Sequence, residues 1–199
     1  MKPYLWSRTT ISGIRALDDP AGHSQIVSML DPEWPEPDMF ETWEPKDRIV
    51  LRFHDEIAER ENRVMPDEKL IASLLTFGEE FRDGDPAKRL FIHCQSGMSR
   101  STAGAMILWA QAHPEVSSKK LFGALREVRP VSWPNTLMLR LADAQLGRSD
   151  RMADAAPAYF ASRLLEDEEL KARMIKLRRT DDIAAMIAAG LHPAPDRDG

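Results

Sequence analysis

The segment LFIHCQSGMSRS, from Leu90 to Ser101, constrains the fold of this 199-residue chain more than any other part. It begins with a run of apolar residues, which predicts a buried parallel strand over residues 90–92. A helical pattern follows over residues 103–111, so the turn between the two elements lies at a helix N-terminus. Backbone N–H groups at that position have no partner within the helix and attract anions. The segment therefore predicts a strand, an anion-binding loop and a helix in immediate succession.

Several residues of this loop are suited to chemistry on a bound anion. Cys94 is the only cysteine of the chain, and the positive end of the helix together with Arg100 favours its thiolate form. The planar guanidinium of Arg100 can hold two phosphate oxygens, and Gly97 lets the backbone close around the anion. A lone cysteine after a strand is usually a buried, unreactive thiol. With His93, Gly97 and Arg100 at these offsets, the pattern favours a nucleophile instead.

Residues 93–101 resemble the His-Cys-x5-Arg-Ser signature of the cysteine-dependent protein tyrosine phosphatase superfamily. The wider chain is similar to its compact dual-specificity-like branch, and to a group of bacterial predicted tyrosine phosphatases in particular. The further similar segments, all between Ile11 and Gly147, are residues 30–32, 51–55, 129–130 and 133–135. The resemblance implies an α/β fold, a three-layer sandwich in which helices flank a central, mostly parallel sheet of four to five strands.

The resemblance also implies a role for each residue around the loop. Cys94 would attack phosphorus as a thiolate. The phosphoryl group would be bound by Gln95, Ser96, Gly97, Met98, Ser99 and Arg100. Ser101 would assist the thiolate as leaving group in the second step, and His93 would be a structural residue that supports the thiolate. Asn135 would tie down the active-site loop, although a simple helix cap explains it almost as well.

A phosphatase of this type also needs a general acid for the leaving oxygen. The resemblance places an aspartate on the loop after the strand that precedes the catalytic one. We expect residues 48–53 to form that strand, and Asp55 follows it directly. Glu56 is the main rival, because it is adjacent and chemically equivalent. The weaker candidates are Asp47, Asp67 and Asp83. We therefore predict that Asp55 is the general acid.

The remaining patterns predict a phosphatase domain over residues 1–147. Its expected strands are residues 11–13, 25–29, 48–53 and 90–92, and its expected helices are residues 66–81, 100–113, 117–128 and 134–147. Residues 31–45 contain four prolines and should form an extended loop. The aromatic residues of this loop, Trp34, Phe40 and Trp43, either pin it to the core or border a substrate cleft.

Beyond residue 147 we expect a helical C-terminal extension over residues 148–189 and a disordered tail over residues 190–199. Within the extension, residues 155–165 and 170–187 have helical patterns, the second interrupted near residue 180. A basic cluster is expected to be a solvated helix face, because acidic residues flank it: Lys171, Arg173, Lys176, Arg178 and Arg179. The extension could pack on the domain, mediate dimerisation or recruit a partner.

Composition limits the compartment and the partners. No apolar run approaches the roughly 18 residues of a membrane span, and the N-terminus lacks the apolar core of a signal peptide. The net charge of −5 argues against nonspecific binding to nucleic acid or to anionic membranes. A single cysteine cannot form an internal disulfide, which fits a reducing cytoplasm. The histidines lack ligand spacing, so we expect no metal and no other cofactor.

The sequence therefore predicts a phosphomonoester hydrolase that acts through a cysteinyl-phosphate intermediate. Protein phosphotyrosine is the first expected substrate, with dual specificity as a variant. A small-molecule phosphatase, for a phosphoinositide, an inositol phosphate or a nucleotide, is the main alternative. It is weakened because residues 95–99 are uncharged, whereas such members of the family tend to carry Lys or Arg inside the loop. A phosphate-binding pseudoenzyme is less favoured, since Cys94, Arg100 and Ser101 are all intact. A sulfurtransferase is also less favoured; it would not need Asp55, so a large loss of activity in Asp55→Asn would argue against it.

Overall fold

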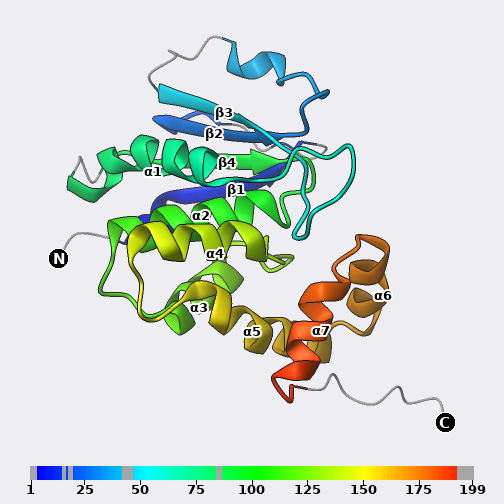
Figure 1. Ribbon diagram of the computed structural model, residues 1–199. Helices are drawn as coiled ribbons and strands as arrows, with labels where there is room; N and C mark the ends of the chain where they lie inside the picture. The colour runs from blue at the N-terminus through cyan, green and yellow to red at the C-terminus, as the bar shows by residue number, and fades with distance from the viewer. Residues whose placement is uncertain (1–3, 15–16, 18–19, 42–46, 84–86, 192–199) are drawn as a thin grey trace.

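The centre of the fold is a sheet of four parallel strands in the order β1-β4-β2-β3 (Figure 1). The strands are β1 (Thr9–Gly13), β2 (Gln25–Leu30), β3 (Arg48–Arg52) and β4 (Leu90–Cys94). The computed structural model describes residues 4–14, 17, 20–41, 47–83 and 87–191 of the chain. All four expected strands are present, which confirms the predicted α/β class with a parallel sheet.

Strand β4 lies between β1 and β2 and is buried along its whole length. A strand that is covered on both faces requires apolar residues on both, which accounts for the unbroken apolar run before His93. The register pairs Cys94 with Gly13 of β1 and with Met29 of β2. Parallel strands bring their carboxyl ends to one edge of the sheet. Cys94 therefore leaves the sheet at the edge where the loops after β2 and β3 also begin.

Helices cover one face of the sheet (Figure 1). They are α1 (Glu68–Asp83), α2 (Arg100–Ala112), α3 (Ser118–Val128) and α4 (Thr136–Leu146), and a short 3-10 helix, η1 (Leu5–Arg8), precedes β1. Helices α1 and α2 pack against the sheet and each other, and α3 and α4 pack against α2. Because α2 is enclosed on all these sides, its residues are buried from Arg100 to Gln111.

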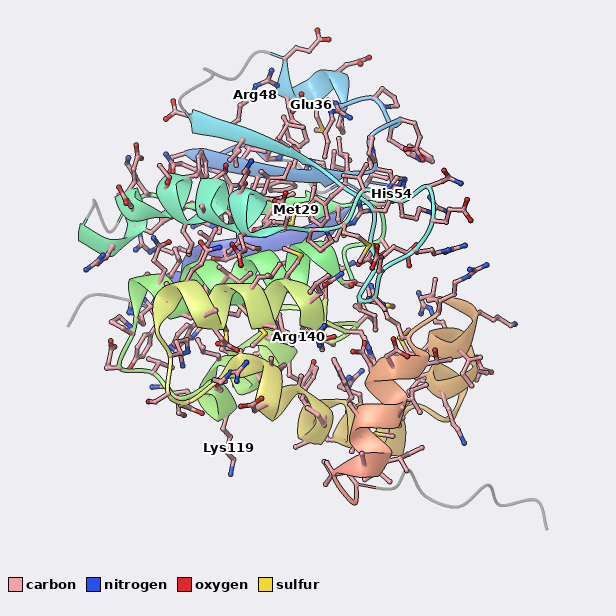
Figure 2. All side chains as sticks on the ribbon, in the orientation of Figure 1. Met29, Glu36, Arg48, His54, Lys119 and Arg140 are labelled. Carbon is pink, nitrogen blue, oxygen red and sulfur yellow. The ribbon has the colours of Figure 1, made fainter. Side chains whose placement is uncertain are left out.

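The other face of the sheet is covered by the segment after β2. Phe91 of β4 and Ile26 of β2 pack there against Phe40, which belongs to the short 3-10 helix η2 (Asp38–Phe40). The guanidinium of Arg48 on β3 holds this segment in place, since it pairs with Glu36 at 3.2 Å and donates to the Phe40 carbonyl at 2.9 Å (Figure 2). Part of the expected extended loop is therefore a fixed cover of the sheet.

The aromatic residues of this segment divide between the two expected roles. Phe40 is fully buried and pins the segment to the core, whereas Trp34 is 42% exposed and lines the main cleft. Trp43, for which the same two roles were expected, lies outside the described residues.

Three further helices follow the domain, α5 (Met152–Glu166), α6 (Glu168–Lys176) and α7 (Thr180–Ala188). They lie together on the side of the molecule away from β3, at the lower right of Figure 1. The pattern over residues 170–187 is divided between α6 and α7, close to the expected interruption. Residues 192–199 of the predicted tail lie outside the described residues. Within the described part of the chain, no helix has the length and apolarity needed to cross a membrane.

Trp133, in the loop between α3 and α4, attaches these helices to the domain. Its ring stacks on Phe160 of α5 with the ring centroids 4.0 Å apart. Its indole N–H donates to Asp182 of α7 at 2.9 Å, and the hydroxyl of Thr136 donates to the same carboxylate at 2.6 Å. Trp133 and Phe160 are both almost fully buried, so the extension packs on the domain.

The loop after β4 lies directly on the backbone at the end of β1. Gly97 has a φ of +66°, and a Cβ there would lie 2.6 Å from the carbonyl carbon of Ser12 and 2.7 Å from the amide nitrogen of Gly13. Both separations are far below van der Waals contact with backbone that cannot move aside. Gly97 is therefore required by its conformation and by its surroundings.

We predict that Gly97→Ala destabilises the protein by about 1–3 kcal/mol, because the new methyl group forces the loop away from β1. Urea unfolding measures this change. Gly123→Ala is the matched control, since Gly123 lies in α3 with no atom within 4 Å of the added Cβ. That variant should be stabilised by about 0.5–1 kcal/mol through helix propensity. Equal effects of the two substitutions would contradict the close packing of the loop.

Candidate active site

The thiol of Cys94 lies beneath the loop that follows it. Its side chain is 1% exposed. The backbone N–H of Gly97 donates to its sulfur at 3.2 Å, and the Oγ of Ser101 lies 3.2 Å from the sulfur. Ser101 belongs to the first turn of α2, so the helix N-terminus faces the same atom. The structure thus brings together the cysteine that the sequence predicts to be the nucleophile and the hydroxyl predicted to assist it.

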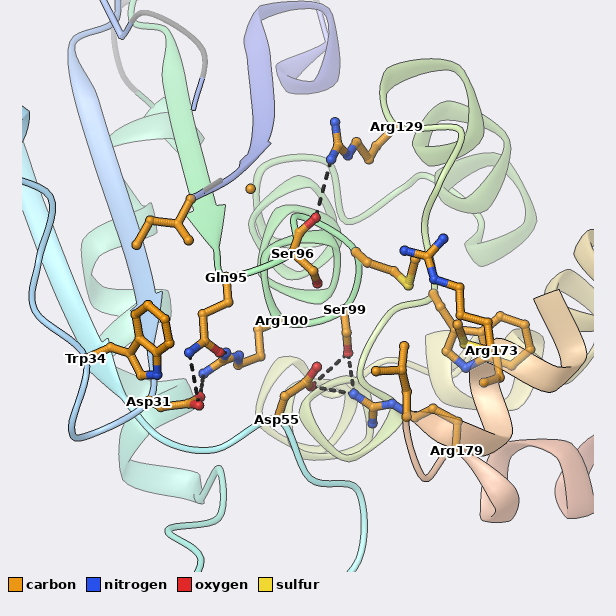
Figure 3. Close-up of a pocket in the computed structure, with 16 residues that line it drawn as sticks. Asp31, Trp34, Asp55, Gln95, Ser96, Ser99, Arg100, Arg129, Arg173 and Arg179 are labelled. Carbon is orange, nitrogen blue, oxygen red and sulfur yellow. Dashed lines mark hydrogen bonds and ion pairs between the residues drawn. The ribbon is translucent and has the colours of Figure 1, made fainter. Parts of the chain in front are cut away.

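The guanidinium of Arg100 is buried and is held in place by hydrogen bonds to three residues. Its Nη1 donates to the Asp31 carboxylate and to the Phe53 carbonyl, both at 2.6 Å. Its Nη2 donates to the side-chain oxygen of Gln95, whose amide also donates to Asp31 at 3.1 Å (Figure 3). The Nε of Arg100 has no hydrogen-bond partner among the described residues. No role was assigned to Asp31 from the sequence, although the residue lies in one of the similar segments, residues 30–32, and directly after β2.

The loop borders a cleft of about 690 Å³ (Figure 3). Five of the residues predicted to bind phosphate line this cleft: Gln95, Ser96, Met98, Ser99 and Arg100. The loop is also anchored from outside. Arg129 donates through Nε to the Gly97 carbonyl at 2.9 Å, and the backbone N–H of Trp133 donates to the Met98 carbonyl at 2.8 Å. These contacts hold the loop in a curved form, which we call the cradle.

His93 points to the opposite face of the sheet from Cys94, because successive residues of a strand alternate between faces. Its Nε2 lies 2.7 Å from the Ser28 hydroxyl, and its ring stacks on Phe40. Burial lowers the pKa of His93 to about 4, so the imidazole is neutral near neutral pH. His93 is therefore a buried residue on an inner strand of the sheet, and its side chain faces away from Cys94.

Within the described residues, no group of three or more His, Cys, Asp or Glu side chains is arranged to hold a metal ion.

Asp55 lies on the loop after β3 and lines the cleft. Its Oδ1 accepts hydrogen bonds from the Ser99 hydroxyl at 2.8 Å and the Asn135 amide at 2.9 Å. The same oxygen lies 2.5 Å from Nη2 of Arg179. Burial raises the pKa of Asp55, but the charges of Arg179 and Arg100 and the hydrogen bonds outweigh it, so the pKa lies below its usual value.

Two of the rival candidates for the general acid, Glu56 and Asp67, make contacts outside the cleft. The Glu56 carboxylate pairs with Arg60 at 3.0 Å and with Arg63 at 3.6 Å, within its own loop. The Asp67 carboxylate accepts from the Leu70 backbone N–H at 2.8 Å, at the start of α1. The side chain of Asp83 is outside the described residues, and Asp47 does not line the cleft.

Asn135 caps α4, which is one of the two roles considered for it, and its side chain also contacts the loop that carries Asp55. Its Oδ1 accepts from the Met138 backbone N–H at 3.0 Å, which caps α4. Its Nδ2 donates to Asp55 and, at 3.0 Å, to the Glu56 carbonyl. The residue that begins α4 therefore also holds the loop that carries Asp55.

Arg179 corrects the expectation that the basic cluster is a solvated helix face. Its side chain is only 3% exposed, and Nη2 donates to the Ser99 hydroxyl at 2.6 Å in addition to pairing with Asp55. It lies in the turn between α6 and α7, where Arg178 has a φ of +59°. Of the other members of the cluster, Arg173, Lys176 and Arg178 are exposed as predicted, and Lys171 is half-buried. The local charge pattern gave no signal for this buried position.

Comparisons with known proteins define the fold. No family model and no curated protein matches the chain. The crystal structure of human DUSP28 matches with a TM-score of 0.50 and 18% identity, over 70% of this chain and 92% of that one. Human tyrosine phosphatase-like serine/threonine/tyrosine-interacting protein matches with a TM-score of 0.47 and 15% identity, over 63% and 78%. The Yvh1 phosphatase domain from Chaetomium thermophilum matches with a TM-score of 0.45 and 17% identity, over 63% and 79%.

At 18% identity, the likeness to DUSP28 shows the fold alone. The chain therefore shares its fold with DUSP28, which agrees with the fold that the residues around Cys94 predict. The family resemblance covered residues 11–147 only, so α5, α6 and α7 lie outside the segment on which the predicted fold was based.

We predict that Arg179→Met raises the pKa of Asp55, because it removes the largest of the favourable charges on the carboxylate while burial still disfavours ionisation. The titration of the Asp55 carboxyl carbon by NMR measures the change. Arg178→Met is the matched control, since Arg178 is the adjacent residue and is exposed. An unchanged Asp55 titration in Arg179→Met would contradict the ion pair.

Proposed function

We propose that the chain is a phosphomonoester hydrolase that acts through a cysteinyl-phosphate intermediate, with phosphotyrosine in cytoplasmic proteins as its substrate class and dual specificity as a variant. The observation that carries the proposal is the environment of the Cys94 sulfur. It lies at the N-terminus of α2, accepts a hydrogen bond from Gly97 and lies 3.2 Å from the Ser101 hydroxyl. A thiolate is the nucleophile that such surroundings stabilise.

In the first step, the loop amides and Arg100 would bind the equatorial phosphoryl oxygens. Asp31 holds the far side of the guanidinium, so that the remaining N–H groups are presented in a fixed orientation. A phosphoryl oxygen that reaches Nη2 would compete with the side chain of Gln95 for it. The Cys94 thiolate would then form a bond to phosphorus as the bond to the leaving oxygen breaks. Protonated Asp55 would donate its proton to that oxygen.

In the second step, water would attack the cysteinyl phosphate. Ionised Asp55 would accept a proton from the water, and the sulfur would leave phosphorus as a thiolate. The hydroxyl of Ser101 is placed to donate a hydrogen bond to the departing sulfur. Because Arg179 and Arg100 hold the pKa of Asp55 below its usual value, the protonated form needed in the first step is favoured only at acid pH. The proposal therefore implies an acid-side pH optimum.

A small-molecule phosphatase remains the second candidate, and one structural observation favours it. The sequence argument against it was the lack of cationic residues inside the loop. The cleft is nevertheless lined by three arginines from outside the loop, Arg129, Arg173 and Arg179. Cations that would serve a substrate with several anionic groups are thus present in the cleft.

Steady-state hydrolysis of p-nitrophenyl phosphate across pH, in the presence of EDTA, tests the proposed function. We expect turnover with an acid-side optimum that is abolished in Cys94→Ser, which removes the nucleophile but conserves its shape. Asp55→Asn should lower kcat by about 10²-fold or more, because the leaving oxygen loses its proton donor.

Thermal unfolding of each variant controls for loss of the fold. Turnover that persists in a folded Cys94→Ser protein would contradict the cysteine mechanism. Absence of turnover by the folded wild-type protein, on this and other aryl phosphates, would contradict the phosphatase proposal.

A further inference from the structure

The cleft contains more positive charge than its own carboxylates balance. Four arginines line it, and two of them are paired: Arg100 with Asp31 at 2.6 Å, and Arg179 with Asp55 at 2.5 Å. Arg129 and Arg173 have no carboxylate partner among the described residues. The chain as a whole carries a net charge of −5, so the positive charge of the cleft is opposite in sign to the net charge of the protein. Uncompensated cations in a cleft attract anionic ligands.

The two arginines that lack a carboxylate partner, Arg129 and Arg173, differ in their other contacts. Arg129 donates to the Gly97 carbonyl, so it has a structural task on the loop. Arg173 comes from α6, is exposed and lines the cleft, and the described part of the chain offers its guanidinium neither a hydrogen bond nor an ion pair. A guanidinium that lines the cleft and makes no hydrogen bond or ion pair within the described residues is free to bind a ligand.

Arg179 supplies a second, independent sign of an absent acceptor. Its side chain is almost fully buried, yet its Nη1 has no hydrogen-bond partner within the described residues. Leaving a buried guanidinium N–H unpaired costs free energy, so an additional acceptor at this group would be favourable. Figure 3 shows Arg173 and Arg179 on the side of the cradle that faces the C-terminal helices, across from Asp31 and Trp34.

We propose that Arg173 and Arg179 form a second anion subsite beside the phosphoryl cradle, so that the preferred substrate carries another anionic group close to its scissile phosphate. The proposal deepens the proposed function and rests on it. The second group would be a carboxylate or phosphate, which the planar guanidinium recognises through paired hydrogen bonds. It would come either from an acidic side chain next to phosphotyrosine in a peptide or from a second phosphate of a small molecule.

The subsite would also connect recognition to the reaction. In the structure, Nη2 of Arg179 is occupied by Asp55 and Ser99. An anionic group that competes for this guanidinium would weaken its hold on the Asp55 carboxylate, which must take up a proton to act on the leaving group. A substrate with the second anionic group would thus favour the protonated form of Asp55, which is the form that donates a proton to the leaving group.

The test compares kcat/KM for matched substrates with the wild-type protein, Arg173→Ala and Lys176→Ala. One pair is a phosphotyrosine peptide with alanine or with glutamate beside the phosphotyrosine. The other pair is an inositol monophosphate and an inositol bisphosphate. p-Nitrophenyl phosphate provides the baseline with a single anionic group. Lys176 is the control because it is an exposed cation of α6 that does not line the cleft.

We expect the wild-type protein to prefer the doubly anionic member of at least one pair by about tenfold, the scale of one charge-assisted contact. Arg173→Ala should lose this preference while its activity on p-nitrophenyl phosphate changes less than about twofold; Lys176→Ala should retain both. The pair that shows the preference identifies the source of the anion.

Lack of preference in both pairs, or an equal loss on all substrates in Arg173→Ala, would overturn the subsite. Turnover of p-nitrophenyl phosphate would persist in either case if the proposed function is right, so failure of the subsite is distinguishable from failure of the function.

Discussion

An ion pair between Asp55 and Arg179 joins three parts of the molecule that lie far apart in the sequence. Oδ1 of Asp55 lies 2.5 Å from the guanidinium, and the Ser99 hydroxyl donates to the same oxygen. The loop after β3, the loop after β4 and the turn between α6 and α7 therefore meet at one carboxylate. The protonation of the proposed general acid and the proposed anion subsite both depend on this pair, because Arg179 is shared between them.

The ion pair requires the C-terminal helices to be held firmly against the domain, and Trp133 provides the attachment. Its backbone N–H donates to the Met98 carbonyl of the cradle, its indole N–H donates to Asp182, and its ring stacks on Phe160. A single buried residue thus contacts the loop after β4, α5 and α7. We therefore propose that residues 148–189 form part of the catalytic unit and are more than an appendage to residues 1–147.

The strand, loop and helix around Cys94 could be predicted from the sequence because their signals are local: an apolar run, a fixed spacing and a helical pattern. The choice of Asp55 came from the family resemblance together with the strand before it, and it left Glu56 as a rival. Arg179 could not be predicted, since its charged neighbours look the same whether that face is solvated or buried. Only the turn at Arg178, with its left-handed backbone, directs one side chain of the cluster into the site. The contact between Asp31 and Arg100 likewise exists only once β2 and β4 are side by side.

The most direct test of this account is a search for the cysteinyl-phosphate intermediate. In Ser101→Ala the departing sulfur loses its hydrogen-bond donor, so the intermediate should accumulate during turnover of an aryl phosphate. Rapid acid quenching followed by mass spectrometry of the proteolytic peptides locates the phosphoryl group. The account predicts phosphate on the peptide that contains Cys94, at the sulfur. Turnover without any covalent phosphate, or phosphate on a different residue, would contradict it.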